Sequence, residues 1–121
     1  MATRKTQTSC GPGAADSNTD LELAALAKAV GHPARIAILR QLTACGVCMC
    51  GTIVKTLPLA QATVSQHLKV LKHAGLVADR AEGTKRIYRL NEAGVAALRD
   101  QLDTFWRRTL SGFENLMKED E

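Results

Sequence analysis

Apolar residues recur at steps of three and four over most of the chain, and this spacing predicts a series of helices. Ordered structure is expected to begin near Asp20, a plausible N-cap. Pro33 suits the first turn of a second helix, Pro58 ends a short third helix, and Gly75 suits the end of a fourth. The predicted helices cover residues 21–30, 33–42, 52–57 and 61–74, and a long final helix follows Asn91.

Two short stretches near the middle of the chain read as strands instead of helices. Residues 76–80 and 85–90 are bounded by turn residues, and residues 82–84 supply the turn between them. The pattern therefore predicts a mainly α-helical fold with one small β-hairpin. A short helix, a turn at residues 58–60, a polar-faced helix and a hairpin form the order of a winged helix-turn-helix.

The final helix carries more apolar residues than a small domain needs for its own core. Their spacing forms one seam, and we expect this seam to form a homodimer interface between terminal helices; packing onto the chain's own core is the alternative. The residues of the seam are Val95, Leu98, Leu102, Phe105, Trp106, Leu110, Phe113 and Met117.

Length and composition limit the class of protein. A chain of 121 residues with 45% apolar and 3% aromatic residues predicts one domain with an aliphatic core. The chain has no apolar run of membrane-spanning length, and residues 1–19 are polar without the apolar segment of a signal peptide. We expect a flexible arm over residues 1–19, a DNA-binding and dimerisation domain over residues 20–118, no membrane partner and a cytoplasmic location.

Positive charge is concentrated in the middle of the chain. Residues 61–89 hold six basic and two acidic residues, whereas residues 91–121 hold four basic and seven acidic ones. This asymmetry indicates a polyanionic partner for the middle segment, and a solvated basic surface is the alternative. Amide and hydroxyl side chains on the helix over residues 61–74 can hydrogen-bond to base edges. In the hairpin, Lys85 and Arg86 can approach the DNA backbone or a minor groove.

Two motifs carry a resemblance to a known family. Residues 62–77 resemble the recognition-helix signature of the ArsR/SmtB family of metal-sensing repressors, and residues 31–39 resemble its second-helix motif. The resemblance implies a homodimeric winged-helix repressor that leaves operator DNA when an inducer binds. It also implies that six residues lie in or beside the major groove, although each could simply face solvent: Gln61, Thr63, Ser65, Gln66, His67 and Lys69.

Three of the four cysteines lie within six residues, at Cys45, Cys48 and Cys50. Soft thiolates select thiophilic ions, and trivalent arsenic or antimony takes three sulfurs. The segment resembles the Cys-x-Cys motif at the start of the third helix in arsenic-responsive members, which implies arsenite or antimonite as the inducer. Those members often have a further thiol where this chain has Ile53, so Cys45 would supply the third sulfur. A regular helix could not bring the three sulfurs together, and Gly46 would help the segment to distort.

Several alternatives remain for these thiols. Cys10 could join a four-sulfur cadmium or lead site, as in relatives that recruit thiols from the arm of the opposite subunit. A Cys45–Cys48 or Cys48–Cys50 disulfide, or a persulfide, would make the protein a redox sensor. Structural zinc and plain burial are further readings. The CxxC spacing of Cys45 and Cys48 also fits a thiol oxidoreductase or metallochaperone, but no β-α-β pattern accompanies it. We expect no enzyme activity and no organic cofactor.

Overall fold

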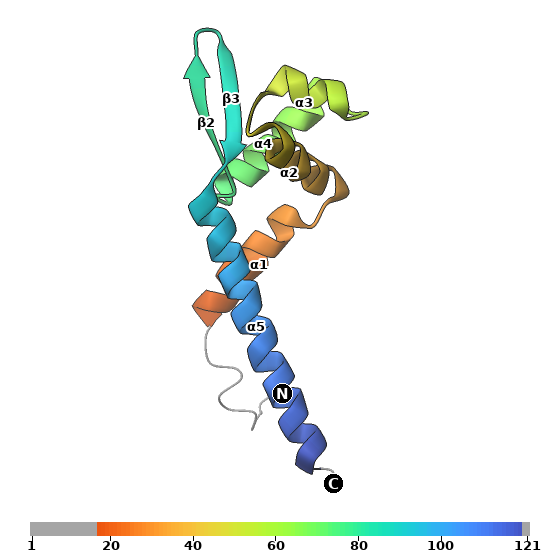
Figure 1. The fold of residues 1–121 in the computed structure, drawn as a ribbon, viewed down its shortest axis with the longest axis vertical. Coiled ribbons are helices and arrows are strands. Elements are labelled where there is room, and N and C mark those ends of the chain that lie inside the picture. Colours follow the sequence, from red (N-terminus) through yellow and green to blue (C-terminus); the bar gives the residue numbers. More distant parts are fainter. Residues whose placement is uncertain (1–16, 120–121) are drawn as a thin grey trace, which may run out of the picture.

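A computed structural model describes residues 17–119 as five helices and a small antiparallel sheet (Figure 1). The predicted mainly helical fold with a β-hairpin is confirmed, as is the winged helix-turn-helix order. In chain order the elements are α1 (Ser17–Val30), α2 (Pro33–Cys45), β1 (Val47–Met49), α3 (Cys50–Thr56), α4 (Gln61–His73), β2 (Val77–Glu82), β3 (Lys85–Leu90) and α5 (Glu92–Glu119).

The hydrophobic core lies between α2, α3, α4 and the start of the hairpin. As the aliphatic composition predicts, the core contains no aromatic side chain among its fully buried members. The helical spacing of Val64, Leu68 and Leu71 places all three on the inner face of α4, where each is fully buried. The largest fully buried side chains are Ile38, Leu42, Ile53, Val64, Leu68, Leu71 and Leu76.

The sheet has one strand that the sequence does not predict. We expected a two-stranded hairpin, but the strand order is β1-β3-β2, with both pairs antiparallel. The cysteine segment supplies β1, whose Cys48 pairs with Tyr88 of β3. With only three residues, β1 is too short to show an alternating pattern. The segment is extended because β3 offers a free edge for backbone hydrogen bonds.

The hairpin is longer and its turn is tighter than predicted. Strand β2 continues to Glu82, which pairs directly with Lys85, so the loop contains two residues. Gly83 takes a positive φ of 65°, which glycine tolerates without steric cost. The expected first strand residue, Leu76, instead closes the end of α4, since its backbone N–H donates to the Leu71 carbonyl at 3.0 Å.

Several helix boundaries also differ from the predicted ones. Helix α1 begins at Ser17, so Asp20 lies in its first turn, where a carboxylate favours the helix dipole, and not at the N-cap. The predicted arm is therefore too long by three residues, and the remainder of it, residues 1–16, lies outside the described part. Helix α2 continues to Cys45, and α3 begins at Cys50 instead of at Thr52.

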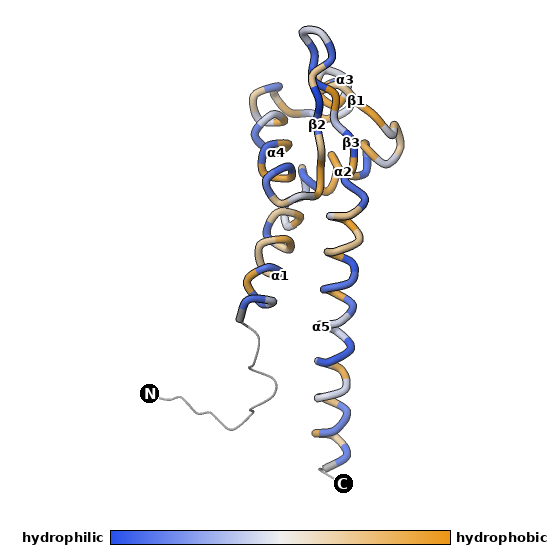
Figure 2. The backbone as a smooth tube through the Cα atoms, turned by 90° about the vertical axis from the view of Figure 1, so that its left-hand side faces the viewer, coloured by the Kyte–Doolittle hydropathy of each residue, from blue (hydrophilic) through white to orange (hydrophobic). Residues whose placement is uncertain are grey.

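Helix α5 starts against the end of α4 and then leaves the domain. A Cβ atom at Gly94 would overlap the carbonyl group of Gly75, so the two helices approach at backbone distance. Beyond this contact, the C-terminal part of α5 extends past the other elements (Figures 1 and 2). The hairpin turn, α3 and α4 lie toward the opposite end of the molecule from the end of α5.

The expected apolar seam of α5 is largely exposed. Trp106, Leu110 and Phe113 keep 54%, 56% and 58% of their surface, whereas Leu98 packs against the core. Packing onto the chain's own core therefore accounts for only the beginning of the seam. Among the helices described, none combines the length and the apolar character that crossing a bilayer requires.

Candidate nucleic-acid interface and thiol cluster

Helix α4 presents a polar outer face beside the hairpin. Helix α3 and the connection over residues 57–60 precede it, and Leu57 and Leu59 of that connection pack against the core. Four of the six residues that the sequence assigns to the DNA surface of α4 are exposed to solvent, whereas Thr63 and His67 are half-buried. The four exposed residues are Gln61, Ser65, Gln66 and Lys69.

His67 is held from the inner side of the molecule. The Arg35 Nε–H donates to His67 Nδ1 at 3.2 Å, and the His32 ring lies 4.6 Å from the His67 ring between centroids. Burial lowers the pKa of His67, and the neighbouring charges of His32 and Arg35 lower it further. The neutral imidazole is therefore favoured, which suits the role of its Nδ1 as the hydrogen-bond acceptor for Arg35.

Arg35 connects three helices and has no role in the sequence-based prediction. Besides contacting His67 of α4, its guanidinium donates to the carbonyls of Lys28 and Ala29 at 3.2 and 3.3 Å. These carbonyls belong to the last turn of α1, and the Lys28 carbonyl also accepts from the Gly31 backbone N–H at 3.2 Å. Arg35 thereby fixes the recognition helix relative to α1. The signal in the sequence was the second-helix motif over residues 31–39, which includes Arg35.

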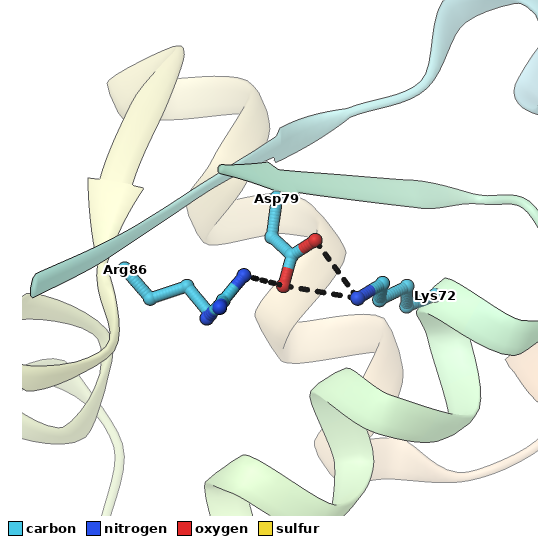
Figure 3. Close-up of polar contacts among 3 residues, drawn as sticks. All are labelled: Lys72, Asp79 and Arg86. Atoms are coloured by element: carbon cyan, nitrogen blue, oxygen red, sulfur yellow. Dashed lines mark hydrogen bonds and ion pairs between the residues drawn. The ribbon is translucent and has the colours of Figure 1, made fainter. Parts of the chain in front are cut away.

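The hairpin carries the two basic residues predicted to approach DNA. Lys85 and Arg86 are both exposed, and Lys85 is the first residue of β3 after the turn. Arg86 is not a free cation, because its Nη1 lies 3.0 Å from Asp79 Oδ2 on the neighbouring strand β2 (Figure 3).

Asp79 joins the hairpin to the recognition helix. Its Oδ1 lies 3.0 Å from Lys72 Nζ of α4, and its Oδ2 accepts from Arg86 (Figure 3). Only 9% of the Asp79 side chain is exposed. The hydrogen bond from Lys72, supported by that from Arg86, lowers the pKa of Asp79 against the opposing effect of burial. Sequence reasoning missed this contact, because no spacing rule connects residues on a helix and two strands.

The thiol cluster spans three elements. Cys45 ends α2, Cys48 is the central residue of β1 and Cys50 begins α3. The expectation that the Cys48–Cys50 pair lies at the start of the third helix is therefore wrong for Cys48, which is 3% exposed in the sheet. The expected distortion is confirmed: Gly46 takes a φ of 81°, and the chain after it is extended.

Two of the cysteines form a disulfide. Cys45 is bonded to Cys48 across a Cα–Cα distance of 6.2 Å, and this is one of the two disulfides expected as alternatives. Cys50 is free, and its sulfur lies 3.7 Å from the Ser65 hydroxyl of the recognition helix. Within residues 17–119, no three Cys, His, Asp or Glu side chains are grouped as metal ligands. Cys10 lies outside the described residues.

The sheet relates the thiol cluster to the Asp79 contact. Cys48 pairs with Tyr88 in the β1–β3 ladder, and Tyr88 pairs with Asp79 in the β2–β3 ladder. Burial raises the pKa of the Tyr88 hydroxyl, and the nearby Cys50 and Asp79 add to this effect. One cross-strand row thus runs from a cysteine to the carboxylate that holds the recognition helix.

Comparisons with known proteins agree with this architecture. A family model described as a helix-turn-helix domain matches residues 30–80. An HTH-type transcriptional regulator of Mycobacterium tuberculosis is 47% identical over 90 residues, which cover 74% of this chain and 83% of that protein. The arsenical resistance operon repressor of Staphylococcus xylosus is 32% identical over 82 residues, covering 68% of this chain and 78% of the repressor. The chain belongs to the ArsR/SmtB family.

One solved structure supports the same assignment. The crystal structure of a "possible transcriptional regulator for arsenical resistance" superposes with a TM-score of 0.63 at 33% identity, covering 72% of this chain and 94% of that one. The ArsR/SmtB relatives are transcriptional regulators and repressors. This chain is accordingly a DNA-binding transcriptional repressor of that family.

Proposed function

We propose that the protein represses transcription as a homodimer and is released from its operator when trivalent arsenic or antimony binds the reduced thiols. The contact between Cys50 and Ser65 is the observation that carries this proposal, because it joins the thiol cluster to the outer face of the recognition helix. A ligand that moves Cys50 has to move a residue assigned to the DNA surface.

The DNA contacts divide into two groups. Gln61, Ser65 and Gln66 are exposed and carry the hydrogen-bonding groups that read base edges. Lys69 and Lys85 are exposed cations suited to phosphate oxygens. Thr63 and Arg86 remain candidates at the edge of this surface, whereas His67 acts through Arg35 to orient the helix.

The exposed seam of α5 supports the homodimer. A helix of 28 residues is about 42 Å long. Its outer half carries a series of large apolar side chains, which a second copy of the same helix can cover. Because helix-turn-helix dimers bind two half-sites one turn of DNA apart, the dimer sets the distance between the two recognition helices.

Metalloid binding requires the reduced form. Among the cysteines of residues 17–119, the disulfide-bonded form leaves one free thiol and does not fit an ion that takes three sulfurs. Two electrons and two protons from a thiol reductant convert the Cys45–Cys48 disulfide to two thiols. Those two sulfurs remain within reach of one ion, and Cys50 supplies the third. Arsenous acid then loses three hydroxyl groups, which leave as three waters with the protons of the three thiols.

Release from DNA follows if the ion binds the DNA-incompetent form more tightly than the DNA-competent one. Drawing Cys50 toward Cys45 and Cys48 would shift the start of α3 and the neighbouring Ser65. Typical coupling free energies between two sites are about 1–3 kcal/mol. A dimer would have one thiol site in each subunit, and the effects of the two sites on DNA affinity would add.

Thiol oxidation is a second candidate signal, and the Cys45–Cys48 disulfide favours it. A peroxide removes two electrons and two protons from the two thiols, and its oxygens leave as two waters. The resulting bond ties the end of α2 to β1, and through β1 to the hairpin. In this version the oxidised form is the one that leaves DNA.

Fluorescence anisotropy distinguishes these signals. A labelled duplex from directly upstream of the gene is titrated with reduced protein, and arsenite, antimonite, cadmium, zinc or peroxide is then added separately. Release by arsenite or antimonite alone supports the metalloid site. Release by peroxide but by no metal or metalloid makes the cysteines a redox switch, and release by cadmium alone points to a different thiophilic ion.

A further inference from the structure

Asp79 lies where the two DNA-binding elements meet. Within residues 17–119, it is the carboxylate that pairs with cations of both the recognition helix and the hairpin, at 3.0 Å to Lys72 Nζ and 3.0 Å to Arg86 Nη1 (Figure 3). No other described part of the chain joins these two surfaces through opposite charges.

The other ion pairs of the described residues differ from this one. Arg80–Glu82, Arg99–Asp100 and Arg107–Asp103 each join neighbours on a single element, and every partner is more than 60% exposed. Such exposed pairs contribute little, because water and salt screen them. The Asp79 side chain is 9% exposed and forms ion pairs with Lys72 of α4 and Arg86 of β3. These two contacts from separate elements hold the carboxylate in place.

This arrangement has two consequences for DNA. It fixes the angle between α4 and the β2–β3 hairpin, and it gives Lys72 and Arg86 an internal anion. Three charged groups therefore present a net charge of +1 to the phosphate backbone, where the two cations alone would present +2. Non-specific binding depends on phosphate neutralisation, whereas specific binding requires both elements to fit the duplex together.

We propose that Asp79 is a positioning residue that determines specificity: it holds the recognition helix and the hairpin in one fixed arrangement and withholds two cations from non-specific phosphate contacts. This proposal rests on the assigned DNA-binding function. It predicts that loss of the Asp79 charge weakens binding to the preferred sequence and strengthens binding to unrelated DNA. A residue with only a structural role would weaken both.

The Asp79→Asn variant tests this, because it removes the charge and keeps the side-chain shape. Two labelled duplexes are used: one selected by the wild-type protein from a random-sequence pool, and one with the same bases shuffled. The affinity for the selected duplex divided by the affinity for the shuffled duplex should fall about tenfold. The salt dependence of binding to the shuffled duplex should become steeper by the contribution of about one phosphate contact.

Matched variants separate position from charge. Glu82→Gln removes the same charge from the same hairpin, where Glu82 pairs only with Arg80, and should leave the ratio unchanged. Asp79→Glu keeps the charge and should retain most of the ratio. Lys72→Gln opens the bridge from the helix side and should lower the ratio, which provides a second test should Asp79→Asn fail to fold.

Two results would overturn the proposal: an unchanged affinity ratio in Asp79→Asn, including a parallel loss of affinity for both duplexes, or the same changes in Glu82→Gln. Failure of the wild-type protein to select any duplex from the pool is a different result. It would remove the DNA-binding function, and this proposal with it, whatever the Asp79 variants do.

Discussion

The sulfur of Cys50 lies 3.7 Å from the hydroxyl oxygen of Ser65, so the free thiol of the cluster touches the recognition helix directly. The other two cysteines, Cys45 at the end of α2 and Cys48 within β1, are bonded to each other. Cys50 therefore separates the two signals proposed for the cluster. A metalloid needs its sulfur as the third ligand, whereas the Cys45–Cys48 disulfide forms without it.

Replacing Cys50 by alanine should abolish one response and preserve the other. The reduced Cys50→Ala protein is expected to need at least about tenfold more arsenite for half-maximal release from DNA, because two sulfurs hold trivalent arsenic less well than three. Peroxide should still form the Cys45–Cys48 disulfide, which thiol counting under denaturing conditions detects. The measurement is anisotropy of the bound duplex with each reagent.

Cys45→Ala is the matched control for this experiment. It removes an exposed cysteine at the end of α2 and prevents the Cys45–Cys48 disulfide while leaving Cys50 in place. Loss of the peroxide response in Cys45→Ala but not in Cys50→Ala would identify the disulfide as the oxidised signal. Full arsenite release from Cys50→Ala would contradict a three-sulfur site.

Gly94 is expected to be essential for the position of α5. A Cβ atom there would overlap the Gly75 carbonyl, and backbone cannot give way as a flexible side chain can. Gly94→Ala should lower the free energy of unfolding by about 1–3 kcal/mol, the usual cost of overpacking. Urea unfolding followed by circular dichroism measures this.

Gly112 provides the comparison within the same helix. A Cβ atom at Gly112 meets nothing within 4 Å, so Gly112→Ala should gain up to about 1 kcal/mol from helix propensity. Equal stability changes in the two variants would show that the contact between Gly94 and Gly75 does not constrain α5.

Much of the fold could be predicted because the helices carry clear periodic patterns. Val64, Leu68 and Leu71 recur at helical spacing and are buried, and the apolar seam of α5 is visible in the sequence for the same reason. The strand β1 could not be predicted in this way. Its three residues are extended by pairing with β3, a tertiary interaction that leaves no local pattern.

The candidate site shows the same division. Residue chemistry and spacing located the polar face of α4 and the thiol cluster. They did not reveal that His67 accepts a hydrogen bond from Arg35, or that Arg86 and Lys72 share Asp79. Those contacts join residues of different elements, so they depend on how the elements pack.

His67 should make the stability of the protein sensitive to mild acid. Its pKa is lowered in the folded state by burial, then by His32 and Arg35. Because the unfolded chain then binds the proton more readily, stability is unaffected above the usual pKa of 6.5 and falls as the pH drops below it. Denaturant midpoints measured between pH 7.5 and pH 5 would follow this loss.

A His67→Gln variant keeps an acceptor for Arg35 but cannot take up a proton, so its midpoint should vary less over the same range. His73→Gln, on the exposed end of the same helix, should behave like the unmodified protein. If His67→Gln and the unmodified protein lose stability in parallel, another group is responsible for the acid sensitivity.

The apolar seam of α5 should govern the oligomeric state. Leu110 of α5 is 56% exposed, and a carboxylate there would be buried in the expected helix–helix interface. Leu110→Glu is expected to weaken dimerisation by about 2 kcal/mol, roughly a factor of 30, which is typical of a central interface residue. Sedimentation equilibrium measures this change directly.

Ser111→Glu introduces the same charge at the next exposed position, beside Glu114 and Arg107 on the polar side of the helix, and should leave the dimer intact. DNA affinity should fall with Leu110→Glu alone, because a monomer reads one half-site. Equal dimerisation of both variants would show that the seam is not the interface.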